Sequence, residues 1–216
     1  MNASIQQAYN LWAAQYDTQI NETRDLEAVA FRTINGNKKM EHALEIGCGT
    51  GKNTLHLLKL AAHVTAVDFS RSMLQVARTK IHAPHVAFVE ADILQEWTFA
   101  HHVYDWIGFS LVLEHVENLA PLFRKAAAVA APHARLYIGE LHPFRQYLGG
   151  KANFDTPEGN QVIPAFTHHV SDFITAAQQY GWQMIDMREW FDEPDRTSPP
   201  RIISFLFEKK ASEINE

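Results

Sequence analysis

The sequence predicts an α/β fold in which a largely parallel sheet is covered by helices. Short β-branched or apolar runs alternate with longer segments of helical spacing, as in strand–helix–strand units. A glycine-rich turn follows the first apolar run and precedes a helical segment. With 216 residues, 46% of them apolar, the chain can fill one core of its own. We therefore expect a single domain over residues 1–216.

Each strand is predicted from an apolar or β-branched run, and each helix from apolar residues that recur on one face. The spacing of Leu55, Leu58 and Ala62 illustrates the helical pattern. Pro121 stands near the start of a later helix, where its missing N–H costs little. The predicted strands cover residues 42–46, 63–68, 85–91, 104–110, 135–141, 182–190 and 201–210. The predicted helices between them cover residues 52–62, 72–81, 121–131 and 170–181.

Composition and charge exclude several functions. The 19 basic and 25 acidic side chains give a net charge of -6, and no block of Lys or Arg stands out. We therefore expect no nucleic-acid partner and no membrane surface. The N-terminal residues lack the pattern of a secretory signal, and the single cysteine, Cys48, cannot form an internal disulfide. Both features favour a cytoplasmic protein, and neither indicates an oligomeric state.

The glycine-rich turn is the strongest sign of a ligand. Gly47, Gly49 and Gly51 follow the first strand, at the edge where open parallel sheets bind ligands. Residues without a Cβ let a ligand approach the backbone, so a nucleotide-like ligand is expected. The spacing is not the G-x-G-x-x-G of dinucleotide sites, because Lys52 stands where that pattern needs glycine. Asp68 ends the second strand, in the place of a ribose-binding carboxylate.

Residues 40–141 resemble the class I S-adenosylmethionine-dependent methyltransferases. The likeness includes "EIGCGTG", "VTAVDFS", "VEADIL" and "GFSLVLEHVEN". It implies S-adenosylmethionine as cofactor and a Rossmann-like sheet of seven strands, mostly parallel, with the last strand antiparallel and helices on both faces. The cofactor-binding residues that the likeness implies are Glu45, Gly47, Gly49, Gly51, Asp68, Phe69, Asp92 and Ile93.

Some of these roles have structural alternatives. Glu45 suits the ammonium group of the cofactor, and Asp92 suits the adenine amino group. Ile93 packs on the adenine ring or simply belongs to the core. The resemblance also implies a lid formed by residues 1–25, where Tyr9, Trp12, Ala13 and Tyr16 share one helical face. Tyr16 then covers the methionine part of the cofactor, with a cation–π contact to the sulfonium, or belongs to an aromatic stripe docked on the core.

Residues 142–167 are too long for an ordinary connection, so an acceptor-site insertion is expected there. His142 is the first candidate for a general base and His115 the second, although each also suits a structural contact. Arg145, Tyr147 and Lys151 follow as substrate-binding candidates, and His169 as a residue of the pocket wall. These groups predict an acceptor with a carboxylate or other acidic group, which Arg145 would clamp.

The acceptor is expected to be a small molecule. The Asn/Asp-Pro-Pro-aromatic motif of methyltransferases acting on nucleic-acid bases or glutamine is absent after the fourth strand. Glu114 and His115 match the end of an E-x-x-E-H metal motif, but Leu111 occupies its first acidic position, so no metal is expected. Two alternatives stay open: a cofactor-binding regulatory or scaffold protein without turnover, and an enzyme that methylates a protein side chain.

Overall fold

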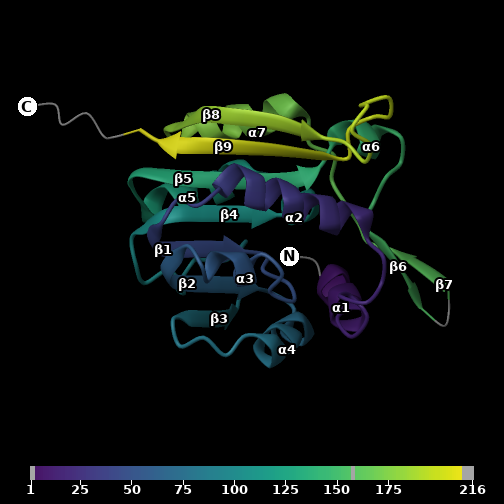
Figure 1. Ribbon diagram of the computed structural model, residues 1–216, viewed down its shortest axis with the longest axis horizontal. Coiled ribbons are helices and arrows are strands. Elements are labelled where there is room, and N and C mark those ends of the chain that lie inside the picture. The colour runs from purple at the N-terminus through teal and green to yellow at the C-terminus, as the bar shows by residue number, and fades with distance from the viewer. Residues whose placement is uncertain (1–2, 157–158, 211–216) are drawn as a thin grey trace, which may run out of the picture.

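The computed structural model describes residues 3–156 and 159–210 and contains a seven-stranded sheet in the order β3-β2-β1-β4-β5-β9-β8 (Figure 1). Strand β9 pairs antiparallel with both of its neighbours, and the other described pairs in this sheet are parallel. The predicted fold class, with its antiparallel last strand, is confirmed. The strands are β1 (Met40–Ile46), β2 (Ala61–Asp68), β3 (Val86–Glu90), β4 (Tyr104–Ser110), β5 (Ala130–Leu141), β8 (Trp182–Trp190) and β9 (Ile202–Lys209).

Helices cover both faces of this sheet. On one face, Phe31 of the second helix packs against Tyr137 of β5, with ring centroids 5.1 Å apart. On the other face, Phe123 and Phe173 pack in a core cluster with aromatic residues of β9. Burial of these rings fixes the helices to the sheet. The helices are α1 (Ala3–Trp12), α2 (Glu22–Asn35), α3 (Thr54–Leu57), α4 (Arg71–Lys80), α5 (Ala120–Val129), α6 (Pro143–Tyr147) and α7 (Val170–Gln179).

The two largest differences from the predicted element boundaries arise where strand pairing decides them. The helix expected over residues 52–62 is limited to α3, since β2 already begins at Ala61, which pairs with Met40 of β1. Strand β5 begins at Ala130, five residues before its predicted start, because Ala130 pairs with Tyr104. Hydrogen bonds to a neighbouring strand override local helical spacing in both places.

The segment from 142 to 167 contains local structure that the sequence prediction did not include. It holds α6 and a hairpin of β6 (Asn153–Thr156) and β7 (Gly159–Val162), which extends beyond the sheet in Figure 1. Trp12 of α1 stacks on Phe154 of β6, with centroids 5.1 Å apart and an interplanar angle of 11°. Helix α1 thus packs between this hairpin and α4, with Met73 of α4 in the same cluster.

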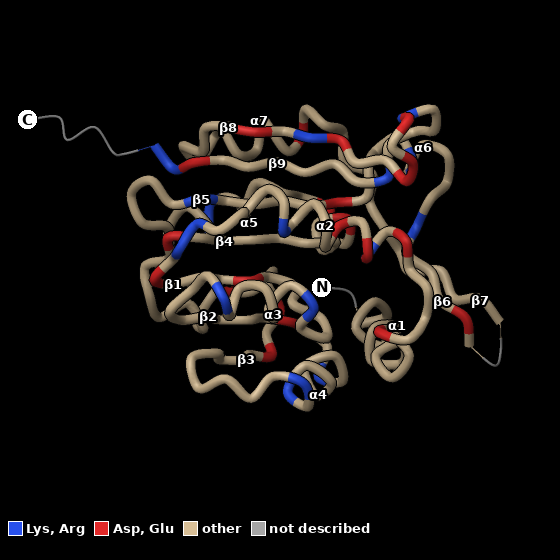
Figure 2. The backbone as a smooth tube through the Cα atoms, viewed as in Figure 1, with Lys and Arg blue, Asp and Glu red and all other residues tan. Residues whose placement is uncertain are grey.

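Helix α2 begins within the predicted lid of residues 1–25 and continues beyond it, and local polar contacts fix its start. The side chain of Asn21 accepts a hydrogen bond from the backbone N–H of Arg24 at 2.9 Å, which caps the helix. Acidic and basic residues are interspersed along most of the described backbone (Figure 2). Among the described residues, none of the helices has the length and apolarity needed to cross a bilayer.

Candidate functional site

The glycine-rich turn follows β1, and its three glycines differ in the space that a Cβ atom would have. Gly47 has φ of +75°, and a Cβ there would lie 2.2 Å from Val112 Cγ2. Gly49 has φ of +53°, and a Cβ there would meet no atom within 4 Å. Gly51 is constrained by packing, since its Cβ would lie 2.9 Å from Ile81 Cδ1 at the end of α4. Of the three glycines, Gly49 therefore leaves open space above the turn.

Asp68 joins this turn to the end of β2. Its Oδ2 accepts a hydrogen bond from the N–H of Gly49, and its Oδ1 accepts one from the N–H of Ser70, both at 2.8 Å. Burial raises the pKa of Asp68 to about 6, although these hydrogen bonds oppose the shift. A carboxylate has about four acceptor positions, so Asp68 can still accept hydrogen bonds from ribose hydroxyls.

A small cavity behind the turn contains charges of both signs. Its wall includes Glu45, Arg24 and Lys52 as well as the glycine turn. Glu45 Oε2 accepts a hydrogen bond from Thr54 Oγ1 at 2.5 Å, and burial raises the pKa of Glu45 to about 8. Arg24 and the buried Glu27 of the same wall were not predicted as site residues. Cations and carboxylates together suit the zwitterionic end of an amino acid ligand.

The other predicted cofactor residues fall into two groups. Tyr16, Asp68 and Phe69 line a second small cavity beside Gly47 and Gly49. Asp92 and Phe69 line a neighbouring cavity of about 210 Å³ near the carboxyl ends of β2 and β3.

Ile93 lies in the main core and is 2% exposed, and its carbonyl accepts a hydrogen bond from Trp97 Nε1 at 3.0 Å. That environment favours the structural alternative for Ile93.

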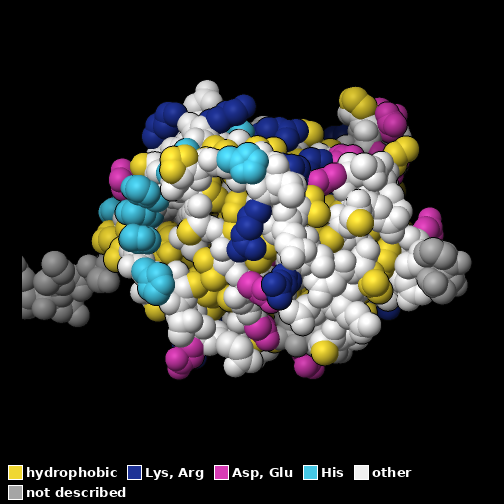
Figure 3. Space-filling model, turned by 90° about the horizontal axis from the view of Figure 1, so that it is seen from below, with side chains coloured by type: hydrophobic (Ala, Val, Ile, Leu, Met, Phe, Trp, Pro, Cys, Tyr) yellow, Lys and Arg dark blue, Asp and Glu magenta, His cyan; other side chains and the backbone are white. Residues whose placement is uncertain are grey.

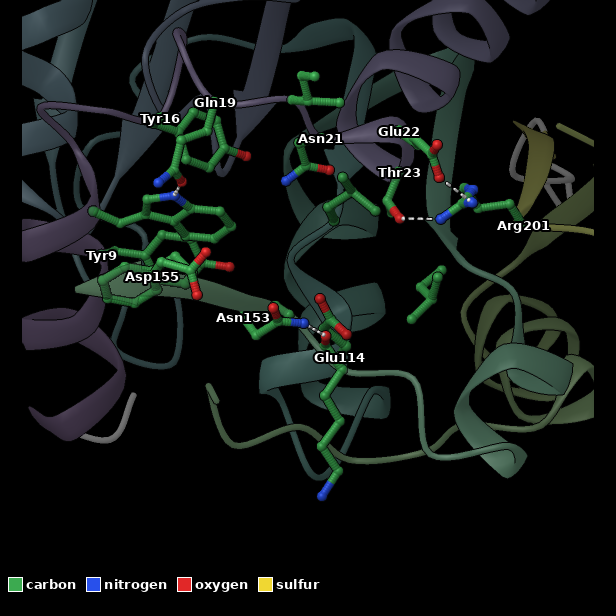
Figure 4. Close-up of a pocket in the computed structure, with 17 residues that line it drawn as sticks. Tyr9, Tyr16, Gln19, Asn21, Glu22, Thr23, Glu114, Asn153, Asp155 and Arg201 are labelled. Atoms are coloured by element: carbon green, nitrogen blue, oxygen red, sulfur yellow. Dashed lines mark hydrogen bonds and ion pairs between the residues drawn. The ribbon is translucent and has the colours of Figure 1, made fainter. Parts of the chain in front are cut away.

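A larger cavity of about 490 Å³, here named the acceptor cavity, is lined by the residues drawn in Figure 4. Tyr16 and Leu111 line this cavity and both small cavities beside the turn. Aromatic side chains of α1 and β6 contribute to its wall. The charged side chains of the wall are Glu22, Glu114, Lys151, Asp155 and Arg201.

His115 lies between helix α1 and the sheet. Its Nδ1 is 2.9 Å from the carbonyl oxygen of Pro164, and its Nε2 is 2.8 Å from Tyr9 Oη. A carbonyl only accepts, so in the neutral ring Nδ1 donates to Pro164 and Nε2 accepts from Tyr9. Both ring nitrogens of His115 are therefore engaged in holding α1 and the loop after the hairpin.

Glu114 precedes His115 in the 3₁₀ turn η1 (Leu113–His115) and lines the acceptor cavity. Its side chain is 6% exposed, and burial raises the pKa of its carboxyl group. Gln146 donates a hydrogen bond to Oε2 of Glu114 at the long distance of 3.5 Å. The sequence placed Glu114 only in an incomplete metal motif, and its burial in a cavity wall depends on the fold.

The predicted acceptor-site residues do not converge on the acceptor cavity, since Lys151 is the one of them that lines it. His142 caps α6, because its Nδ1 accepts from the N–H of Phe144 at 3.1 Å, and its Nε2 lies 3.3 Å from Glu189 Oε1. Burial lowers the pKa of His142, which Glu189 partly opposes. These contacts match the structural alternative for His142.

The remaining candidates lie in surface contacts. Arg145 Nη2 donates to Asp192 Oδ2 at 2.8 Å and to the carbonyl of Pro199 at 3.1 Å. Tyr147 Oη lies 2.6 Å from Nδ1 of His169, the residue that precedes α7. Arg145, the expected clamp on an acidic acceptor, is thus paired with Asp192 in the structure.

Histidines gather on one side of the molecule in Figure 3. The ring of His42 stacks between those of His63 and His102, at centroid distances of 5.0 and 4.3 Å. These residues lie at the end of the sheet opposite the glycine turn, since His42 and His63 stand near the starts of their strands. Within residues 3–156 and 159–210, no group of three or more His, Cys, Asp or Glu residues is arranged to hold a metal ion.

Comparison with known proteins relates this chain to methyltransferases. Residues 44–138 match the family model described as a methyltransferase domain. An uncharacterized methyltransferase of Emericella nidulans is 27% identical over 97% of this chain and 86% of its own length. The ubiquinone biosynthesis O-methyltransferase of Xanthomonas oryzae pv. oryzae is 26% identical over 64% of this chain and 59% of its own length.

A solved structure supports the same fold. The N-methyltransferase NodS from Bradyrhizobium japonicum WM9, in complex with S-adenosyl-L-homocysteine, superposes with a TM-score of 0.70. The two proteins are 17% identical, and the superposition covers 96% of this chain and 97% of NodS.

Proposed function

The chain belongs to the class I S-adenosylmethionine-dependent methyltransferases, and from that premise we propose that it methylates a small molecule bound in the acceptor cavity. One observation carries the proposal. Tyr16 and Leu111 line the acceptor cavity and also both cavities at the glycine turn, so an acceptor and a cofactor would share a boundary. Close approach of two bound reactants is the main requirement of a direct group transfer.

The residues at the turn fit S-adenosylmethionine. Gly49 leaves space that a Cβ would fill, and Asp68 has spare acceptor positions for the ribose. Arg24 offers a positive charge to the methionine carboxylate, and the carboxyl oxygens of Glu45 can accept hydrogen bonds from the ammonium group. Bound S-adenosylmethionine supplies an electrophilic methyl group. The chain's own contribution is to bind both reactants, align them and exclude water.

A small molecule fits the enclosure better than a macromolecule. Helix α1 and the β6–β7 hairpin pack together through Trp12 and Phe154, and both contribute residues to the cavity wall. We infer that residues 1–25 act as the lid and residues 142–167 as the acceptor-site insertion of one domain. The Xanthomonas relative is named an O-methyltransferase and NodS an N-methyltransferase, so fold alone does not select the acceptor atom.

The proposal is tested with purified protein and S-adenosylmethionine. Calorimetric titration measures cofactor binding, and release of S-adenosylhomocysteine is followed after addition of a cell extract divided into low- and high-molecular-weight fractions. We expect release with the low-molecular-weight fraction. Turnover confined to the high-molecular-weight fraction would favour a macromolecular acceptor. Cofactor binding without turnover in either fraction would contradict the proposed transfer to a small molecule.

A further inference from the structure

Glu114 accepts a longer hydrogen bond than the other buried carboxylates around the site, although Oε2 of Glu140 also has no partner among the described residues. Asp68 accepts from two backbone N–H groups at 2.8 Å, and Glu140 accepts from the N–H groups of Val112 and Leu113 at 3.0 and 2.9 Å. Glu45 accepts from Thr54 at 2.5 Å. In the described part of the chain, Glu114 has the single 3.5 Å bond from Gln146. A buried carboxylate of this kind needs a further donor.

His115 does not supply that donor. Its Nε2 lies 3.8 Å from Glu114 Oε1, beyond hydrogen-bond distance, and it is already bonded to Tyr9 Oη. The carboxylate of Glu114 therefore faces the acceptor cavity with unused acceptor positions. Figure 4 shows its side chain among those that line this cavity.

The cations of the cavity do not create a site for an anion. Arg201 donates to Glu22 Oε2 at 2.5 Å and to Asp192 Oδ1 at 2.5 Å, so two carboxylates compensate its charge. Lys151 is exposed at the rim, and Asp155 is an additional acid of the wall. The buried carboxyl of Glu140 is also close enough to interact electrostatically with Glu114. An acidic acceptor placed against Glu114 would be repelled.

Resting on the proposed function, we propose that the acceptor is a hydroxyl or amine with an apolar body, which donates its O–H or N–H to Glu114 and loses that proton to Glu114 during transfer. The aromatic walls formed by Tyr9, Trp12, Tyr16 and Phe154 bind the apolar body. Glu114 is thus a catalytic residue that also selects against anionic acceptors.

The step balances as follows. A lone pair of the acceptor's oxygen or nitrogen forms the new bond to the methyl carbon. The carbon–sulfur bond breaks, and its electron pair stays on sulfur, which becomes neutral. The O–H or N–H bond of the acceptor breaks, and its proton passes to an oxygen of Glu114.

The first experiment measures ligand selection by the wild-type chain. Phenol, aniline and benzoate present a hydroxyl, an amine and a carboxylate on the same ring. Their binding to the complex of the protein with S-adenosylhomocysteine is measured by ligand-observed NMR titration. We expect phenol or aniline to bind at least about tenfold more tightly than benzoate. Benzoate binding equal to or tighter than both others, or no binding of phenol and aniline, overturns the proposal.

The second experiment uses Glu114→Gln, which keeps the shape of the side chain and removes the base. The matched control is Glu117→Gln, at an exposed acid three residues away. With an acceptor that the wild type methylates, we expect kcat to fall about 10²–10⁴-fold in Glu114→Gln. The acidic limb of the pH–rate profile should disappear as well, while Glu117→Gln behaves as wild type. Unchanged kcat in Glu114→Gln overturns the catalytic role.

Cofactor affinity separates the two proposals. We expect S-adenosylmethionine to bind Glu114→Gln within about twofold of wild type, since Glu114 is not among the residues that line the small cavities at the glycine turn. If the wild type itself fails to bind the cofactor or to release S-adenosylhomocysteine, the proposed function fails. If it methylates carboxylates in preference to hydroxyls and amines, only the role of Glu114 fails.

Discussion

Tyr9 Oη lies 2.8 Å from His115 Nε2, and this contact joins helix α1 to the segment that follows β4. The two rings also meet nearly edge to face, with centroids 5.4 Å apart. Because Nδ1 of His115 is held by Pro164, the imidazole is fixed from both sides. His115, the second catalytic candidate of the sequence, thus connects α1 and the loop after the hairpin to the segment that follows β4.

The first prediction concerns this connection. Tyr9→Phe removes one hydroxyl and leaves Nε2 of a buried histidine without its partner, so the free energy of unfolding should fall by about 1–3 kcal/mol. S-adenosylmethionine should also dissociate faster, since the lid is held less firmly. Chemical denaturation and stopped-flow dissociation measure the two effects.

The matched control is Tyr147→Phe, which removes a similar Tyr–His contact, Tyr147 Oη to His169 Nδ1 at 2.6 Å, on the exposed surface. That variant should change the free energy of unfolding by less than about 0.5 kcal/mol. Equal destabilisation by the two substitutions would mean that the Tyr9 contact has no special part in holding the lid.

The second prediction concerns cofactor binding by Asp68. Asp68→Ala removes a carboxylate that we assign to the ribose, and charged hydrogen bonds contribute about 1.5–3 kcal/mol each. We expect the dissociation constant for S-adenosylmethionine to rise at least tenfold in calorimetric titration. Asp105→Ala is the control, because Asp105 accepts from Glu41 N–H and His42 N–H at the other end of the sheet. Wild-type affinity in a folded Asp68→Ala protein would contradict the assignment.

The third prediction separates two glycines of the same turn. Gly49→Ala places a methyl group in open space, so we expect the protein to fold. Its free energy of unfolding should fall by about 1–2 kcal/mol because alanine must adopt a left-handed backbone, and it should bind the cofactor poorly. Gly47→Ala instead forces a Cβ against Val112 and adds about 1–3 kcal/mol of overpacking to that cost. Thermal unfolding and calorimetric titration distinguish them. Normal cofactor binding by Gly49→Ala would show that no ligand approaches the backbone there.

The fourth prediction compares two arginines. Arg145 was expected to bind the acceptor, but it pairs with Asp192 and is not among the residues that line the acceptor cavity, whereas Arg201 lines it. With an acceptor that the wild type methylates, Arg201→Ala should raise KM several-fold. The substitution removes a side chain of the cavity wall and the ion pair that holds Glu22 at the start of α2. Arg145→Ala should leave KM within about twofold of wild type. The reverse order would restore the acceptor role of Arg145.

The sequence allowed the sheet and the glycine turn to be predicted because both depend on local patterns. Apolar runs such as 104–110 are typical of strands that are buried on both faces of a parallel sheet. Glycines between a strand and a helix are typical of a ligand-binding turn. The hairpin after α6 was missed, because β7 is exposed throughout and has no alternating apolar pattern. Its contact with α1 depends on one stacked pair, Trp12 and Phe154.

The acceptor side was harder to predict because its residues meet across large separations in the chain. Arg145 and Asp192 are 47 positions apart, and Arg201 and Glu22 are 179 positions apart, so neither pairing is visible in a local motif. His142 was favoured as a general base because it follows a predicted strand. In the structure its ring caps the short helix α6. Glu114 was visible in the sequence, but only the fold shows that it is buried and poorly supplied with donors.

The fifth prediction concerns the pH dependence of stability. Burial, followed by the charge of Glu114, raises the pKa of Glu140 to about 8 in the folded chain, whereas an unfolded Glu has a pKa of about 4.3. A raised folded pKa means that folding favours the protonated carboxyl. This contribution to stability is complete below the unfolded pKa and is lost as the pH rises through the folded pKa.

Glu140→Gln removes the titration and keeps an oxygen that can accept from Val112 and Leu113. The free energy of unfolding of the wild type should therefore fall relative to that of Glu140→Gln between pH 5 and pH 8. The change should be on the order of a few kcal/mol, since one pKa unit corresponds to about 1.4 kcal/mol. Urea denaturation across this range measures it, with Glu41→Gln at an exposed position as the control. A difference between wild type and Glu140→Gln that stays constant with pH would show that Glu140 keeps its ordinary pKa in the folded protein.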